Sequence, residues 1–223
     1  MDCVFPVPAN GTRGSVDAAQ RGMEFAFSWF ADPLFKGDYP PSMRQAVSSR
    51  LPSFSCRRIL APDWLLGFHR PQLLQHRSVC AAQKTVQSGG EADVAAAVQH
   101  MLTWISHRYP SIPIIITENG MSEPNLPSRS LARSLCDDQR VRFYRSYLSS
   151  VLQAKRQGVP VEGYYAWSLL DNWEWAMGFS ERFGAVFVNF TDPSLPRFPK
   201  ASALWFKHLL RAHSMHFRGH VVL

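Results

Sequence analysis

Apolar residues recur every three or four positions in several stretches of the chain, a spacing that places them on one side of a helix. The first such stretch spans residues 15–30, where Ser15 can cap the helix and Asp32-Pro33 is expected to end it. Its inward side is predicted to be formed by Ala19, Met23, Ala26, Phe27 and Phe30. A turn over residues 37–41 follows, because one Gly, one Asp and two Pro residues occur there together.

The same spacing predicts three further helices. One begins at Glu91, one opens at Asp137 and Asp138, where acidic side chains suit the positive end of a helix, and the last covers residues 200–211. Residues 158–160 (Gly-Val-Pro) are expected to stop the middle one. The predicted inward residues are, in turn, Ala95, Val98, Leu102 and Ile105; Val141, Tyr144, Leu148, Val151 and Leu152; and Ala201, Leu204, Trp205, His208 and Leu209.

Short runs that are apolar on both faces are typical of buried parallel strands. Residues 114–117 (Ile-Ile-Ile-Thr) form such a run, residues 161–168 form a second predicted strand, and residues 64–68 form a weaker third. Apart from that third run, residues 56–90 show neither the period of a strand nor that of a helix. The alternation of helices and strands predicts an α/β fold built from repeated βα units.

Composition narrows the class of protein. Of 223 residues 46% are hydrophobic, which is enough for a packed core. The net charge is +7, but residues 56–90 hold five of the basic side chains against one acid and contain no nucleic-acid-binding module, so no nucleic-acid partner is expected. The 4 cysteines form no Cys-x-x-Cys pair, which argues against a disulfide framework or a metal site.

Neither a membrane span nor a targeting segment is evident. No stretch approaches the roughly 20 apolar residues that a membrane span needs. Residues 1–11 lack the basic and long apolar regions of a signal peptide. We therefore expect a soluble chain without a signal peptide, whose compartment the sequence leaves open.

An acid closes the Ile-rich strand. Glu118 directly follows residues 114–117, and Asn119-Gly120 is expected to turn the chain after it. Because the carboxyl ends of parallel strands form the working face of an α/β fold, Glu118 is a candidate functional residue. A solvated acid at the start of a loop is the alternative, and position alone does not separate the two.

A tract rich in tryptophan follows the second strand. Residues 166–175 hold Trp167, Trp173 and Trp175, with Glu174 between the last two. An aromatic plane beside a carboxylate suits a sugar, whose ring stacks on the one and whose hydroxyls donate to the other. The alternative is that the tract is a tryptophan-rich segment of the core. The acidic residues in the tract argue against this, because burying an unpaired acid costs free energy.

These two regions carry the resemblance of the chain to a known family. The chain resembles glycoside hydrolase family 1, the β-glucosidase family of retaining glycosidases, over about residues 10–55 and 91–212. The matching motifs lie at residues 29–33, 37–40, 43–44, 50–52, 116–120, 165–175, 182–184, 197–200, 202–203 and 205–206.

The resemblance implies a fold and a site. The fold would be a partial (β/α)8 TIM barrel, from the end of strand five through helix eight, forming a single incomplete domain over residues 1–223 with a divergent segment at about 56–90. Glu118 would be the catalytic nucleophile, Trp167 the platform under the sugar and Glu174 the acceptor for sugar hydroxyls. Trp175 would donate its indole N–H and Phe183 would line the pocket. Neither a cofactor nor a metal is implied.

One part of the family's machinery is missing from the sequence. A retaining glycosidase needs a second carboxyl, which in this family belongs to an Asn-Glu-Pro motif on strand four. None of the 7 Glu residues lies in that motif, and Glu123, in Ser-Glu-Pro, follows Glu118 in the same loop. We therefore expect the chain alone to be inactive on β-glycosides and to associate through exposed barrel edges. The alternative is a non-catalytic, truncated relative with weak sugar binding or an interaction role.

Overall fold

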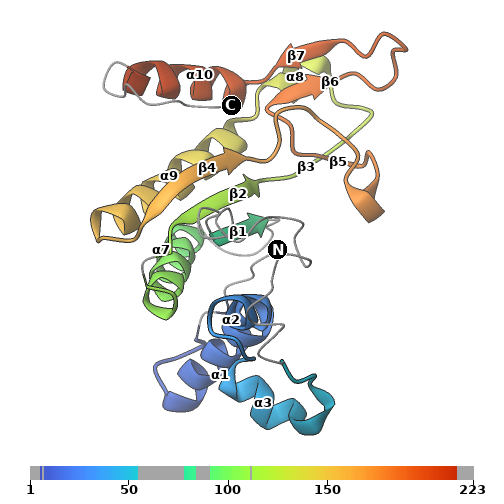
Figure 1. Ribbon diagram of the computed structural model, residues 1–223. Helices are drawn as coiled ribbons and strands as arrows, with labels where there is room; N and C mark the ends of the chain where they lie inside the picture. Colours follow the sequence, from blue (N-terminus) through green and yellow to red (C-terminus); the bar gives the residue numbers. More distant parts are fainter. Residues whose placement is uncertain (1–5, 7, 55–77, 84–90, 111, 215–223) are drawn as a thin grey trace.

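The computed structural model describes residues 6, 8–54, 78–83, 91–110 and 112–214. Its amino-terminal part is helical (Figure 1). The elements there are α1 (Arg13–Met23), the π-helical turn η1 (Glu24–Ser28), α2 (Trp29–Phe35), α3 (Pro41–Val47) and the short η2 (Ser48–Arg50). A parallel sheet with its helices follows: β1 (Ser78–Gln83), α7 (Glu91–Arg108), β2 (Ile114–Gly120), α9 (Asp138–Arg156) and β4 (Val161–Ala166).

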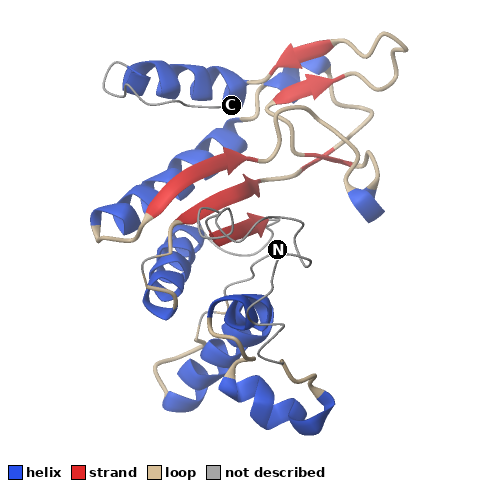
Figure 2. Cartoon of the chain, in the orientation of Figure 1, coloured by secondary structure: helices blue, strands red, loops and turns tan. Residues whose placement is uncertain are grey.

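The remaining elements are shorter, apart from the last helix. They are β3 (Glu123–Pro124), α8 (Leu131–Leu135), η3 (Trp175–Met177), β5 (Glu181–Arg182), β6 (Val186–Val188), β7 (Arg197–Pro199) and α10 (Ala201–Ser214). β3 pairs antiparallel with β5, and β6 pairs antiparallel with β7. Figure 2 shows these short strands beyond one end of the parallel sheet. They therefore belong to the loops that follow the parallel strands.

The first helical stretch is longer than predicted, and Asp32-Pro33 does not end it. The helix begins after Thr12, whose carbonyl accepts the Ser15 amide, and it continues through Pro33 to Phe35. The wide turn of η1 changes which side chains face inward. Phe27 is buried as predicted, whereas Phe30, predicted inward, is 50% exposed.

The parallel sheet has the order β1-β2-β4. β2 lies in the middle, with Ile116 opposite Cys80 of β1 and opposite Tyr164 of β4. Ile114 and Ile116 are fully buried in one core with residues of α7 and α9, so both helices cover the same face of the sheet. The predicted strand at residues 114–117 is thereby confirmed, whereas the strand predicted at residues 64–68 lies outside the described residues.

Two predicted helix faces differ from the observed ones. On α9, Tyr144 and Val151 are buried as predicted, but Leu152 is 51% exposed. On α10, the predicted inward residues Leu204 and His208 are exposed, and Ser202 is buried instead. The reason is that polar contacts, which hydrophobic spacing does not register, hold Ser202 inward.

A buried polar cluster fastens α2 to α7. The guanidinium of Arg108 at the end of α7 contacts the carboxylates of Asp32 and Glu24. The Tyr109 hydroxyl donates to Asp32 at 2.6 Å. Burial, together with the adjacent Asp32 carboxylate, raises the pKa of Tyr109, which therefore stays a neutral donor. The helices that precede the sheet are thus part of the same packed unit as α7.

Within the described part of the chain, no helix combines the length and the apolar character that crossing a membrane requires.

Candidate functional site

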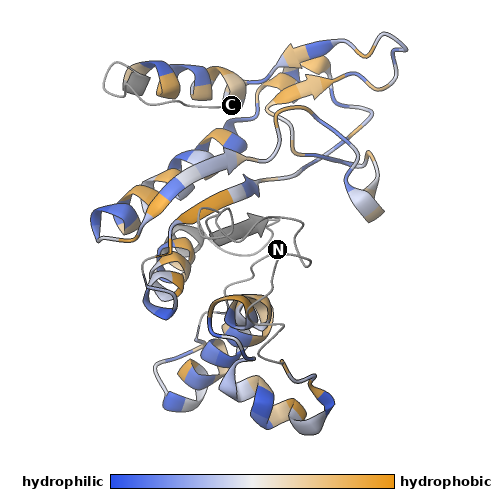
Figure 3. Ribbon diagram, in the orientation of Figure 1, coloured by the Kyte–Doolittle hydropathy of each residue, from blue (hydrophilic) through white to orange (hydrophobic). Residues whose placement is uncertain are grey.

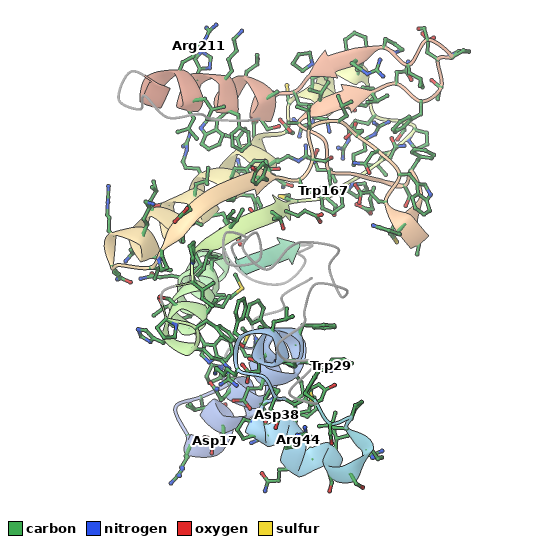
Figure 4. The ribbon with its side chains drawn as sticks, in the orientation of Figure 1. Asp17, Trp29, Asp38, Arg44, Trp167 and Arg211 are labelled. Carbon is green, nitrogen blue, oxygen red and sulfur yellow. The ribbon has the colours of Figure 1, made fainter. Side chains whose placement is uncertain are left out.

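The end of β2 and the segment after β4 meet at one edge of the sheet. β2 is apolar over its first half and polar at its end (Figure 3). The strand runs on through Gly120 rather than turning at Asn119. Glu118 therefore lies within β2, at the irregular pairing between Ile116 and Asn119, and not at the start of a loop, which was the alternative interpretation of the sequence. The Trp167 amide donates to the Asn119 carbonyl at 2.7 Å. Figure 4 shows Trp167 just beyond the end of β4. Glu118 and Trp167 are therefore held at the same carboxyl edge.

Gly120 allows the two segments to approach this closely. A Cβ atom built on Gly120 would lie 1.8 Å from the Trp167 carbonyl oxygen and 3.4 Å from the Phe183 ring. No side chain fits in that space. The Ser168 amide donates to the Phe183 carbonyl at 3.2 Å, and Phe183 is buried. Phe183 thus lies against the end of β2 and the Trp167 segment together.

Glu174 reaches the same place from the loop after β4. Its side chain is only 5% exposed, and its Oε1 accepts the Trp167 indole N–H at 3.2 Å. Burial is the largest cause that raises the pKa of Glu174, and the nearby charge of Glu118 raises it further. Glu174 is thus linked through Trp167 to Asn119, the residue next to Glu118.

Trp175 lies differently from the other predicted site residues. It begins η3, has a positive φ of 48° and is 76% exposed. Its ring packs against Trp173 with 5.7 Å between the ring centroids. The structure therefore brings together Glu118, Trp167, Glu174 and Phe183, while Trp175 stands at the exposed border of the same loop.

A buried carboxylate that the sequence analysis did not single out anchors this loop. Asp171 accepts from Arg182 at 2.5 Å and from Lys200 at 3.0 Å. It also accepts the backbone amides of Gly184 and Val188, at 3.0 and 3.3 Å. Burial lowers the pKa of Lys200 to about 8, although Asp171 opposes that shift. The segment between Trp167 and Glu174 is thus tied to β5, β6 and the start of α10.

A second buried ion cluster supports the end of β2 from behind. The fully buried Arg140 of α9 donates to the carbonyls of Met121 and Arg182, at 3.1 and 2.8 Å. Its guanidinium also contacts Asp137 at 2.6 Å and Glu123 at 3.3 Å. Glu123 is therefore engaged in an ion pair on the outer side of its loop, which argues against a direct chemical role.

Two tyrosines, the buried Tyr144 and the half-buried Tyr164, hold the segments on either side of the site. The Tyr144 hydroxyl donates to the Trp167 carbonyl at 3.0 Å, and the Tyr164 hydroxyl donates to the Asn119 side chain at 2.6 Å. Burial raises the pKa of both hydroxyls, so each remains a neutral donor. Local sequence patterns did not reveal these contacts, because the partners are 23 and 45 positions apart.

The arrangement suits a polyhydroxylated ring. A sugar ring can stack on the indole of Trp167, and its hydroxyls can donate to the buried carboxylate of Glu174. The carboxylate of Glu118, a residue type that can act as a nucleophile, lies at the end of β2 beside them. Among the described residues, no group of three or more His, Cys, Asp or Glu side chains is arranged to hold a metal ion.

Comparison with known proteins gives a consistent result. The model of glycosyl hydrolase family 1 matches residues 70–215. β-Glucosidase 6 of Oryza sativa subsp. japonica is 35% identical, over 95% of this chain and 46% of its own length. β-Glucosidase 42 of Arabidopsis thaliana is 36% identical, over 95% of this chain and 49% of its own length. The chain thus spans about half the length of the curated relatives it matches.

Solved structures agree with this picture. A rice β-glucosidase mutant, in a covalent complex with glucose, superposes with a TM-score of 0.79 at 32% sequence identity. The superposition covers 93% of this chain and 50% of the rice chain. A β-glucosidase from the fungus Humicola insolens and an aphid myrosinase superpose over a similar share. The described elements therefore correspond to part of a (β/α)8 barrel enzyme.

Proposed function

Because this chain belongs to glycosyl hydrolase family 1, we propose that it forms the C-terminal part of a retaining glycosidase that hydrolyses O-linked β-glycosides. The observation that carries the proposal is the meeting of Glu118, at the end of β2, with the hydrogen-bonded pair of Trp167 and Glu174. Glu118, the aromatic plane of Trp167 and the buried Glu174 together form one wall of the proposed sugar-cleaving site.

Each site residue has a role in this proposal. Trp167 forms the platform under the sugar ring, and its indole N–H orients Glu174. Glu174 accepts hydrogen bonds from sugar hydroxyls, for which the ionised carboxylate is required. Trp175 donates its exposed indole N–H to the sugar, and Phe183 closes the apolar side of the pocket.

Glu118 is the proposed nucleophile. One of its oxygens attacks the anomeric carbon, the glycosidic bond breaks, and the leaving oxygen takes a proton from a second carboxylic acid. Water, deprotonated by that second carboxylate, then attacks the same carbon and releases Glu118. The second carboxyl has to lie about 5–5.5 Å from the first.

The proposal assigns that second carboxyl to the part of the barrel that this chain does not contain. No Asn-Glu-Pro motif occurs in the sequence. Residues 1–223 would then be a single incomplete barrel domain that runs from the end of strand five through helix eight. Loss of general acid catalysis alone lowers a rate by about 10²–10⁴, so the chain by itself is expected to show negligible turnover.

A joined protein tests the function. The part of rice β-glucosidase 6 that this chain does not match, which the proposal takes to be its amino-terminal half, is fused to the chain in one polypeptide. We expect the joined protein to hydrolyse an aryl β-glucoside, and we expect Glu118→Gln to abolish that activity. Glu162→Gln, at an exposed position of β4, is the matched control and should leave the rate unchanged.

The same joined protein distinguishes the alternative function from the proposed one. If the joined protein binds glucose but does not hydrolyse the aryl glucoside, the chain is a non-catalytic relative that retains sugar binding. If Glu118→Gln has no effect on an active joined protein, the proposed nucleophile is wrong.

A further inference from the structure

The loops that follow β2 and β4 belong to different parts of the proposed site. Glu118 lies at the end of β2, and Trp167 and Glu174 lie in the loop after β4. The short strand β5 ends that second loop and also pairs antiparallel with β3, which lies in the first. The Asn125 amide extends this pairing by donating to the Ser180 carbonyl at 2.7 Å. Figure 1 shows β3 and β5 beyond the end of the parallel sheet.

The side chain of Arg182, in β5, bonds to both loops at once. Its Nε donates to the side-chain oxygen of Asn125, in the loop after β2, at 2.7 Å. Its Nη1 donates to the carboxylate of Asp171, in the loop after β4, at 2.5 Å and to the Val188 carbonyl at 3.0 Å. One guanidinium therefore links the loop that follows Glu118 to the loop that carries the proposed sugar platform.

The guanidinium of Arg182 is held in one orientation. The residue is only 8% exposed, and its guanidinium lies over the rings of Phe187 and Phe190, at 4.1 and 5.1 Å from their centroids. Its own carbonyl accepts from the buried Arg140 at 2.8 Å. Because the donors of an arginine form a rigid planar fork, packing the plane against these rings also fixes the directions of its hydrogen bonds.

The residues that follow Arg182 contact the sugar-binding loop directly. The Phe183 carbonyl accepts the Ser168 amide at 3.2 Å, and the Gly184 amide donates to Asp171 at 3.0 Å. A Cβ atom built on Gly184 would lie 2.1 Å from the Asp171 backbone nitrogen, so no side chain fits between the two segments. A displacement of Arg182 would therefore displace the segment that begins at Trp167.

We propose that Arg182 is a positioning residue, which holds the loop after β2 and the loop after β4 at a fixed separation and so sets the place of Glu118 relative to Trp167 and Glu174. The hydrogen bonds of its guanidinium go to protein groups, so it acts through the two loops and not on the sugar. The role rests on the proposed function, because it is defined by the parts that Glu118, Trp167 and Glu174 play there. The alternative is that Arg182 only fills buried space, and that each loop is held by its own contacts.

A substitution at one end of the guanidinium, measured at the other end, tests the link. In the joined protein described above, Asn125→Ala removes the acceptor of the Arg182 Nε. Gly184 and Val188 donate their amides to Asp171, beyond the other end of the guanidinium. We expect hydrogen exchange at these two amides to accelerate by at least about fivefold, although Asn125 lies in the other loop.

Two further variants show whether Arg182 transmits the effect. Asn125→Asp is the matched control, since it keeps an acceptor for Arg182 and loses the side-chain donor to the Phe179 carbonyl. It should leave the exchange at Gly184 and Val188 unchanged. In an Arg182→Lys background, Asn125→Ala should cause no further acceleration, because the single lysine nitrogen does not bridge both loops.

Kinetics of Arg182→Lys separate positioning from simple packing. Lysine keeps a cation beside Asp171, so the joined protein should still fold. We expect kcat for the aryl glucoside to fall by about 10–100-fold, because Glu118 moves relative to the sugar. The inhibition constant of glucose should change by less than about threefold, because Trp167 and Glu174 remain paired. Arg197→Lys, at an exposed arginine of β7, is the matched control and should leave both values unchanged.

Four results would overturn the inference. They are unchanged exchange at Gly184 and Val188 in Asn125→Ala, equal acceleration in Asn125→Asp, an unchanged kcat in Arg182→Lys, and losses of kcat and glucose affinity in Arg182→Lys that are equal. The outcome is separable from that of the catalytic proposal, since exchange needs no activity. A joined protein that shows the coupled exchange but does not hydrolyse the glucoside supports the link between the loops and removes the catalytic assignment. An active joined protein without the coupled exchange removes only the role of Arg182.

Discussion

Individual side chains at the carboxyl edge of the sheet have conflicting requirements. In its proposed role Glu174 accepts hydrogen bonds from a sugar most strongly as the ionised carboxylate, yet burial and the neighbouring charge of Glu118 raise its pKa. An acid whose pKa is higher in the folded than in the unfolded state destabilises the fold once it ionises. Ionisation of Glu174, which favours binding of a sugar in the proposed site, therefore lowers the free energy of unfolding.

Glu174→Gln is predicted to change binding and stability in opposite directions. In the joined protein, kcat/KM for the aryl glucoside should fall by about 10–100-fold, because a charged acceptor is lost. The melting temperature should rise at a pH above the raised pKa of Glu174, where the native carboxylate carries its charge, and should change little at pH 3, where the carboxyl is protonated in the folded and the unfolded state. Steady-state kinetics and thermal melts at the two pH values check this. A variant that is less stable at the higher pH would show that burial does not oppose the charge.

Asp171→Asn tests the anchor of the sugar-binding loop. The substitution leaves Arg182 and Lys200 without the carboxylate that compensates them, and losing one partner of a buried ion pair costs about 3–5 kcal/mol. Amide hydrogen exchange at Gly184 and Val188, which donate to Asp171, should accelerate by at least about 100-fold. Asp192→Asn, at a half-buried acid in the hairpin between β6 and β7, is the control. Equal exchange in both variants would mean that Asp171 does not hold the loop.

At the level of the elements, the packing of β2 against the segment after β4 determines the site. Gly120→Ala would place a methyl group against the Trp167 carbonyl, where only backbone fits. The two segments should move apart and carry the indole away from Glu118, with a loss of activity in the joined protein of about 10²-fold, as expected for a displacement of about 1 Å. Gly14→Ala, where nothing lies within 4 Å, is the matched control and should be neutral or slightly stabilising. Full activity of Gly120→Ala would show that this close approach is unimportant.

The sequence predicted some elements well and others poorly, for identifiable reasons. The strand at residues 114–117 and the helix from Glu91 were predicted because apolar contacts alone determine them. The inward prediction for Leu204 and His208 on α10 was wrong, because the buried Asp137 carboxylate holds Ser202 inward instead. Asp171 was recognised only as part of a motif, since its cationic partners are 11 and 29 positions away. The spacing of hydrophobic residues along the sequence carries no information about such long-range polar contacts.

At the scale of the whole molecule, the described elements form one wall of a barrel. The parallel sheet, its covering helices and the carboxyl-edge site are complete enough to hold Glu118, the proposed nucleophile, at the same edge as Trp167, the proposed sugar platform. The opposite wall, with the second carboxyl that the retaining mechanism needs, has to come from the other half of the barrel. Under the proposed function, the acceptor role of Glu174 favours hexoses with free hydroxyls at C4 and C6, and the leaving group would be selected mainly by that other half.

Covalent trapping tests the central claim most directly. The joined protein is incubated with an activated 2-deoxy-2-fluoro-β-D-glucoside, which lets the glycosyl intermediate form but slows its hydrolysis, and is then digested and analysed by mass spectrometry. The account predicts one added sugar on the peptide that contains Glu118, and no added sugar in Glu118→Gln. A sugar attached to a different carboxylate, or no covalent adduct in a joined protein that hydrolyses the aryl glucoside, would contradict it.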